Sequence, residues 1–165
     1  MWSFKLLFSL SLCLFMTACG WQPLYTTPED STTVSYSLKI ATIPDRHGQI
    51  LRNFLVDMMI PEGTPPEPKY ILKVVLTEEI AGIAVAKNEN TIRKEATLTG
   101  LITLTESKTK KVVHTHTVKA INSFAVIGKN YYADIIAEDY AIKEASRLLA
   151  EKIRLVVSIY LKNNP

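Results

Sequence analysis

The sequence predicts an α+β fold, a two-layer sandwich in which two helices pack on one face of a four-stranded mixed sheet. Three observations predict this class. Several segments alternate apolar and polar residues with the period of two that is typical of half-buried strands. Two others repeat apolar residues every three or four positions, as amphipathic helices do. The resulting order is strand, helix, three strands and helix, in which the three successive strands form an antiparallel meander.

The first strand and the first helix begin this order. The strand is predicted over Thr33–Ala41, where every second residue is apolar. After Pro44 the period becomes helical, and Pro61 ends the helix. Asp45 near the start suits the positive end of the helix dipole. The apolar face of this helix comprises Ile50, Leu51, Phe54, Leu55, Met58 and Met59, whereas Arg52, Asn53 and Asp57 are expected to point away.

Three further strands follow a proline-rich connector at 61–69. They are predicted at Tyr70–Ile80, Thr91–Thr105 and Lys111–Ala120. Residues 81–90 form either a long hairpin or a continuation of both neighbouring strands, with the turn at 88–90. In the third strand, a solvated face opposite a buried face is expected. The solvated face holds Thr97, Thr99, Thr103 and Thr105, and the buried face holds Ala96, Leu98, Ile102 and Leu104.

The final helix is predicted over Tyr131–Leu161, after a connection at 121–130. Its apolar stripe comprises Ile135, Ile136, Leu148, Leu149, Ile153, Val156 and Val157. Alanines at 137, 141, 145 and 150 allow close approach to a sheet. Both helices must bury their stripes on the one apolar face of the sheet, which is why two layers are expected.

The N-terminal segment has the layout of a secretory signal peptide. One positive charge at Lys5 precedes an apolar run from Leu6 to Phe15, which is too short for a permanent membrane span of roughly 20 residues. The sequence Met-Thr-Ala-Cys at 16–19 resembles the bacterial lipobox. The resemblance implies cleavage after Ala18 and acylation of Cys19, whose chains anchor a protein stably when two or more are present. The alternative is an ordinary cleaved signal peptide that leaves a free thiol.

These features divide the chain into a lipoprotein signal peptide at 1–18, a lipidated tether at 19–32 and one domain at 33–165. Trp21 and Tyr25 in the tether either rest among lipid headgroups or pack on the edge of the domain. Removing residues 1–18 leaves 147 of the 165 residues, enough for one domain with a continuous core. Neither cysteine lies in the domain, so no disulfide is expected there.

Charge and motifs favour a non-enzymatic protein. The formal charge of +3 falls to +2 without Lys5, and this balance calls for no nucleic acid. The chain has no glycine-rich phosphate loop and no Gly-x-Ser-x-Gly motif. His114 and His116 share a face of the fourth strand, as two metal ligands would, but no third ligand lies nearby in sequence. We therefore expect no metal, no cofactor and no catalytic residue.

The basic residues suggest an anion site at one end of the sandwich. Lys87, Arg93 and Lys94 flank the turn between the second and third strands, and Lys129 precedes the final helix. Clustered guanidinium and ammonium groups bind phosphate well. The alternative is a scattered set of solvated side chains.

Several segments together resemble the LPS-assembly lipoprotein family, LptE, in its alphaproteobacterial form. They are Cys-Gly-Trp-Gln-Pro-Leu-Tyr at 19–25, Ile-Pro-Asp-Arg at 43–46, Gln-Ile-Leu-Arg-Asn at 49–53, Pro-Lys-Tyr-Ile-Leu at 68–72, Thr-Ile-Arg at 91–93 and the alanine-rich final helix. The resemblance covers nearly all of the mature chain. It implies a fold of two helices on a four-stranded sheet, in agreement with the element order above.

The resemblance also implies a function. Members of this family plug the β-barrel protein LptD, assist its assembly and contact lipopolysaccharide on its way to the outer leaflet. For this chain it implies an outer-membrane lipoprotein that faces the periplasm, with Lys87, Arg93, Lys94 and Lys129 as lipopolysaccharide contacts. The alternative is a periplasm-facing lipoprotein that binds a small ligand or an envelope polymer without a barrel partner.

Overall fold

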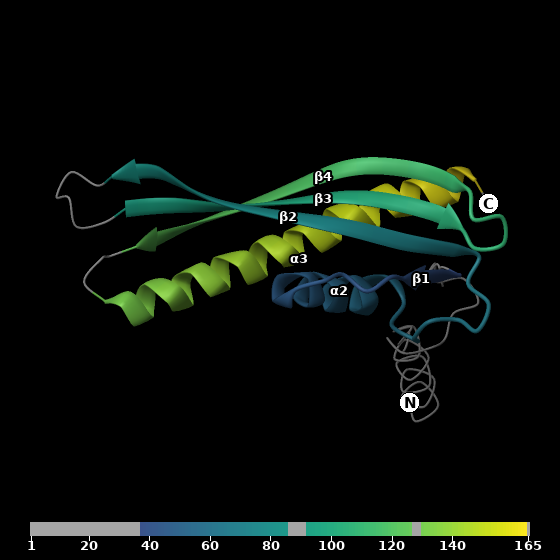
Figure 1. Cartoon of the computed structure of the whole chain (residues 1–165), viewed down its shortest axis with the longest axis horizontal. Helices are drawn as coiled ribbons and strands as arrows, with labels where there is room; N and C mark the ends of the chain where they lie inside the picture. Colours follow the sequence, from purple (N-terminus) through teal and green to yellow (C-terminus); the bar gives the residue numbers. More distant parts are fainter. Residues whose placement is uncertain (1–36, 86–91, 127–129, 165) are drawn as a thin grey trace, which may run out of the picture. The chain divides into compact units, whose positions relative to one another are not determined.

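The computed structural model describes residues 37–85, 92–126 and 130–164, all within the unit Ser35–Pro165. The order of its elements, strand, helix, three strands and helix, confirms the predicted α+β class. The elements are β1 (Leu38–Ile40), α2 (Arg46–Met59), β2 (Tyr70–Val85), β3 (Ile92–Glu106), β4 (Val112–Val126) and α3 (Tyr131–Asn163), as Figure 1 shows.

The four strands form one mixed sheet in the order β1-β2-β3-β4. β1 runs parallel to β2, with Leu38 opposite Tyr70, whereas β2, β3 and β4 are antiparallel neighbours. A parallel pair needs a crossover connection between its strands, and the segment that contains α2 provides it. The predicted meander of three strands is therefore confirmed.

The strands differ from the sequence prediction mainly in length. β2 continues to Val85, so the described part of 81–90 extends the strand. β4 continues to Val126, and the prediction that residues 121–126 form a connection is wrong. Cross-strand pairs with β3 hold this extension, including Ala96 opposite Asn122 and Lys94 opposite Phe124. In the first predicted strand, residues 33–36 lie outside the described residues.

α2 begins at Arg46, directly after Asp45 in the N-cap position. The backbone N–H of Gln49 donates to the Asp45 carbonyl at 3.0 Å, while the Asp45 side chain makes no capping bond. Asn53 is exposed as expected, but Arg52 is half-buried and its Nε is enclosed without a hydrogen-bond partner. The expectation that Arg52 points away is therefore wrong, because its long side chain lies partly against the domain.

α3 begins after Asn130, whose side chain accepts a hydrogen bond from the Ala133 N–H at 3.2 Å. Its buried stripe starts only at Ala141. Ile135 and Ile136 are 43% and 49% exposed, so their assignment to the buried stripe is wrong. The buried residues of α3 are Ala141, Ile142, Ala145, Ser146, Leu149, Ala150, Ile153 and Val157.

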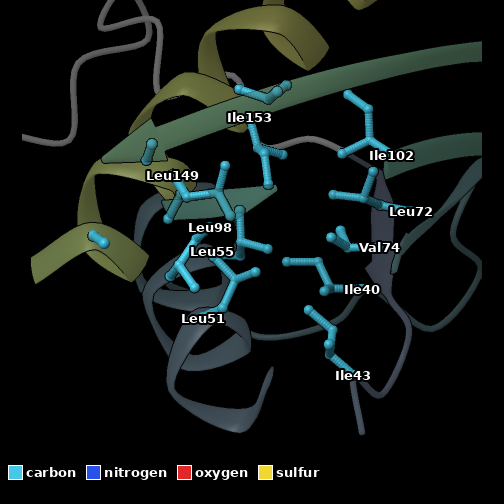
Figure 2. Close-up of a cluster of buried hydrophobic side chains, with 14 of the residues drawn as sticks. Ile40, Ile43, Leu51, Leu55, Leu72, Val74, Leu98, Ile102, Leu149 and Ile153 are labelled. Atoms are coloured by element: carbon cyan, nitrogen blue, oxygen red, sulfur yellow. The ribbon is translucent and has the colours of Figure 1, made fainter. Parts of the chain in front are cut away.

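The core lies between the two helices and one face of the sheet (Figure 2). Leu51 and Leu55 of α2 point toward the same apolar cluster as Leu149 and Ile153 of α3. The sheet contributes Leu72, Val74, Leu98 and Ile102 to this cluster. Gly100 of β3 lies beneath α3, where an added Cβ would be 3.5 Å from Leu149 and Ile153. The core is thus continuous from α2 through α3 to the sheet.

The opposite face of the sheet carries the threonines that the sequence assigns to it. Side chains alternate between faces along a strand, so the odd-numbered residues of β3 lie opposite its buried even-numbered ones. Across the three long strands this outer face includes Thr77, Thr97, Thr99, Thr103, Thr105, Thr115 and Thr117. Exposed aliphatic side chains interrupt it, with Leu101 42% and Ile121 51% exposed.

Candidate functional site

The five residues that the sequence singles out divide into two groups. Cys19, Lys87 and Lys129 lie outside the described residues. Arg93 and Lys94 lie at the beginning of β3, at the end of the sheet far from the turn between β3 and β4. Thirteen residues separate Arg93 from Glu106 along the strand, a distance of roughly 44 Å.

Arg93 and Lys94 occupy opposite faces of β3, because neighbouring residues of a strand alternate. Arg93 is exposed and lies between Ala84 and Ala125 on the threonine-rich face. Lys94 is half-buried on the helix-bearing face, opposite Phe124 of β4. The two charges therefore share one end of the sheet but not one surface.

The first turns of α3 add exposed aromatic side chains at the same end. β4 pairs with the start of β3 through Val126 and Ile92, and α3 begins five residues after Val126. Tyr131 and Tyr132 are 80% and 74% exposed. Together with the exposed Ile135 and Ile136, these rings form an apolar surface of a kind that marks interaction sites. In the sequence, two adjacent tyrosines close to two adjacent isoleucines could have indicated this surface. The helical periodicity instead assigns the isoleucines to the core.

An ion pair and a hydrogen bond fix the beginning of α2 between α3 and the sheet. Arg46 contacts Asp139 of α3 at 3.1 Å, and His47 Nδ1 lies 2.7 Å from a carboxylate oxygen of Glu78 in β2. Neither pair can be predicted from the sequence, because the partners are far apart in the chain. Since Asp139 is the ninth of the 33 residues of α3, α2 starts beyond the first two turns of α3, and no described helix lies alongside those turns.

His114 and His116 line a shallow groove of about 350 Å³ between β4 and the last turns of α3. Their rings are stacked with centroids 6.1 Å apart, and His114 also stacks on Tyr160 at 4.7 Å. The other lining residues are Val156, Ile159, Asn163 and Asn164. None of the described residues that line the groove is a carboxylate.

A wider hollow of about 540 Å³ lies at the end of the sheet where β3 turns into β4. It is lined by Glu67, Pro68, Lys69, Glu106, Ser107 and Lys108. Its mixed charges favour neither an anion nor a cation. The backbone N–H of Ser107 donates to the Lys69 carbonyl at 2.8 Å, so part of its polar wall serves to join the connector to the turn.

Arg147 of α3 lies between two carboxylates of the same helix, Glu144 and Glu151. The hydrogen bond and charge of Glu144, with the charge of Glu151, raise the pKa of Arg147 above its ordinary value, as expected for ion pairs along an exposed helix face. Within residues 37–85, 92–126 and 130–164, no three His, Cys, Asp or Glu side chains are grouped to hold a metal ion. In the same ranges, neither helix combines the length and apolarity that crossing a membrane requires.

Comparison with known proteins identifies relatives by structure. Neither a family model nor a curated protein sequence matches the chain. A protein assigned as a lipoprotein from Caulobacter crescentus CB15 superposes with a TM-score of 0.66 at 21% identity, covering 79% of this chain and 93% of its own. Rare lipoprotein B from Shewanella oneidensis gives 0.58 at 10% identity, covering 76% and 95%. A minor lipoprotein from Acinetobacter baumannii gives 0.55 at 17%, covering 74% and 89%.

The likeness to these three structures establishes a shared fold. It covers about three quarters of this chain and nearly the whole of each other chain. The fold of two helices on a four-stranded mixed sheet is therefore one that bacteria use in envelope lipoproteins. At these identities the likeness carries no residue-level function from one chain to another.

Proposed function

We propose that this chain is a bacterial outer-membrane lipoprotein that plugs and helps to assemble the LptD β-barrel during lipopolysaccharide transport. The observation that carries the proposal is a lipobox at 16–19 ahead of a domain with the fold of three bacterial lipoproteins. Acyl chains on Cys19 would hold the domain at the membrane, since each buried CH₂ contributes about 0.8 kcal/mol. The finer assignment to LptD rests on the resemblance of segments 19–25, 43–53 and 68–72 to the LptE family.

The surface of the domain suits a plug. Large transmembrane barrels have polar interiors. The outer face of the sheet offers many threonine hydroxyls, with exposed aliphatic side chains such as Val75 and Leu101 among them. The hydroxyls can hydrogen-bond a polar wall, and the charged Lys73, Glu79, Glu95 and Lys119 on the same face would need polar partners there, because burying an unpaired charge is costly. This role needs shape and no catalytic group, so we propose that the protein is not an enzyme.

The end of the sheet that carries Arg93 and Lys94 supports contact with lipopolysaccharide. Lipid A combines phosphates with acyl chains. At this end, two cations lie near the exposed Tyr131, Tyr132 and Ile135 of α3. Charged groups bind phosphate and apolar side chains accept hydrocarbon, so this end of the domain supplies both kinds of contact, with Arg93 on one face of the sheet and Lys94 on the other.

The test is recovery of the barrel with the tagged chain from detergent-solubilised outer membranes of its own host. We expect LptD to co-purify in a stable one-to-one complex, and barrel assembly to fail in cells that lack this chain. A matched control uses the Cys19→Ser variant, which separates loss of the anchor from loss of the partner. Recovery of the acylated chain without LptD would contradict the plug.

A second candidate function is a periplasm-facing binding module without a barrel partner. The groove beside His114 and His116 favours it, because a concave surface with stacked aromatic rings suits a small ligand or an envelope polymer. This module would be monomeric in detergent, whereas the plug would elute with its barrel. Size-exclusion chromatography of material purified from native membranes distinguishes the two functions.

A further inference from the structure

β4 is an edge strand of the described sheet, because the strand order ends with it. An edge strand has one row of backbone N–H and C=O groups that the sheet does not use. In an antiparallel pair, alternate residues direct these groups toward the partner strand and away from it. Only every second residue of β4 therefore has backbone groups in the free row.

Two hydrogen bonds identify this row. Lys152 Nζ donates to the Lys119 carbonyl at 2.8 Å, so this carbonyl is one that the β3 ladder leaves available. The Glu106 N–H donates to the Lys111 carbonyl at 2.9 Å, so even-numbered residues of β3 face β4. From Ile92 to Leu104, before the register shifts at Thr105, even-numbered residues of β3 lie opposite even-numbered residues of β4. The free row therefore comprises the odd-numbered residues Thr115, Thr117, Lys119, Ile121, Ser123 and Ala125.

Part of this row borders the groove described above. His114 and His116 project from β4 to the helix-bearing face, where Val156, Ile159 and Tyr160 of α3 complete the groove. Lys152 of α3, one helical turn before Val156, donates a hydrogen bond to the Lys119 carbonyl. This bond marks one end of the stretch of β4 whose outward backbone groups are unused by the described sheet. Between Val112 and Lys119, an open hydrogen-bonding edge thus lies beside an apolar and aromatic groove.

The charges around this stretch are positive. Lys110 and Lys111 precede β4 and are exposed, while Lys119 and Lys152 lie at the other end. No acidic side chain lines the groove. A ligand of this edge would therefore be favoured by negative charge at its two ends.

We propose that Val112–Lys119 of β4 binds an extended peptide strand with apolar side chains at alternate positions and acidic residues at its ends. The strand pairs with Thr115 and Thr117 through about four backbone hydrogen bonds. Its inward side chains enter the groove over His116 and Tyr160. This is recognition by strand addition, in which the main chain supplies affinity and alternate side chains supply specificity.

The other open edge of the described sheet lacks this combination. β1 pairs with β2 only from Tyr70 to Leu72. Later residues of β2 therefore also have a row of backbone N–H and C=O groups that the described sheet does not use. There, however, the inward side chain of Glu78 is held by His47 of α2 at 2.7 Å. A strand added at that edge would place its inward side chains against the Glu78 carboxylate and its imidazole partner, which is a poor contact for apolar groups. β4 is therefore the favoured edge.

The test uses the acylated mature chain in detergent and a fluorescent peptide, Glu-Phe-Thr-Val-Thr-Phe-Glu, followed by fluorescence anisotropy. We expect saturable binding that Thr117→Pro weakens at least tenfold, because proline removes an N–H of the free row while leaving the β3 ladder intact. The matched control is Ile80→Pro, which removes an N–H from the free edge of β2 and should not change the affinity. The same peptide with methylated backbone amides should not bind.

Three results would overturn the proposal. They are the absence of saturable binding, equal binding by the Thr117→Pro variant, and equal binding by the amide-methylated peptide. Sedimentation of the chain without peptide adds a further outcome, because concentration-dependent dimers that Thr117→Pro dissociates, together with no binding of the peptide, would assign this edge to a second copy of the chain instead. Since the methylated peptide leaves the protein unchanged, a folding defect in the proline variant does not obscure the result.

Discussion

At the scale of single residues, two glycines show how close contact decides what a position accepts. Gly48 lies in the first turn of α2, and an added Cβ would be 2.8 Å from the side chain of Ile43 and 3.2 Å from its backbone. Gly100 lies under α3, where the nearest atoms would be at the ordinary distance of 3.5 Å. The two positions carry the same residue for different reasons, since only the first requires the missing Cβ.

We predict opposite effects of alanine at these two glycines. Gly48→Ala should lower the free energy of unfolding by about 1–3 kcal/mol, because the overpacking cost exceeds the helix-propensity gain of about 1 kcal/mol. Gly100→Ala should leave stability unchanged or raise it by up to about 1 kcal/mol, because glycine in a strand costs conformational entropy. Urea unfolding of both variants measures the difference. Equal destabilisation would contradict the contact at Ile43.

Cys19 carries the second prediction at this scale. Cys19→Ser should abolish acylation and move the chain from the membrane fraction to the soluble periplasmic fraction. The physical reason is that two or more acyl chains are needed for stable anchoring, and a hydroxyl at this position accepts none. Mass spectrometry of the mature wild-type chain provides the check. An unmodified cysteine would show that the signal peptide is an ordinary one.

At the scale of elements, the two helices differ in how much of each is covered. α2 is 14 residues long and α3 is 33. α2 starts where Arg46 contacts Asp139 of α3. Only from about that residue onward is α3 covered by α2 as well as by the sheet. Beyond that point the face of the helix decides burial, since Leu149 is fully buried whereas Leu155, on the outward side of the same helix, is 61% exposed.

This coverage predicts unequal effects of two leucine truncations in α3. Leu149→Ala should lower the free energy of unfolding by about 2–5 kcal/mol, because it removes buried methyl groups and leaves a cavity. Leu155→Ala should change it by less than about 0.5 kcal/mol, as expected for an exposed position. Thermal or chemical unfolding measures both, and a large effect at Leu155 would indicate an interface that covers it.

The ion pair that positions α2 should contribute little to stability. Arg46 and Asp139 have side chains that are 72% and 36% exposed, so water screens the attraction. A double-mutant cycle with Arg46→Ala and Asp139→Ala should give a coupling energy below about 1 kcal/mol. A larger coupling energy would mean that contacts other than the attraction between the two charges also join these side chains.

At the scale of the whole domain, the two ends of the sheet have different properties. The described chain enters at Ser37, beside Tyr70 and near the β3–β4 turn, since the Tyr70 N–H donates to the Ser37 carbonyl at 3.0 Å. Arg93 and Lys94 lie at the opposite end of β3. The end at which the described chain begins is thus separated from Arg93 and Lys94 by the length of the long strands.

We predict that lipopolysaccharide binds at the end with Arg93 and Lys94. The double variant Arg93→Ala/Lys94→Ala should retain several-fold less lipopolysaccharide on immobilised chain, because two phosphate-binding cations are removed. The matched control is Lys108→Ala/Lys110→Ala in the β3–β4 turn, which removes the same charge from the opposite end of the sheet. Equal loss in both double variants would indicate attraction by net charge alone.

The sequence by itself determined the type and order of the elements. Apolar residues recur every second position around Leu72 and every three or four positions around Leu55, and these periods indicate a strand and a helix and which face of each is buried. Only the tertiary structure decided how far each element is covered. Ile135 and Ile136 fit the helical stripe yet are exposed, because a stripe records what a helix can bury and not what lies beside it. The separation of Arg93 and Lys94 onto two faces, by contrast, follows from the predicted strand itself, since neighbouring residues of a strand alternate between its faces.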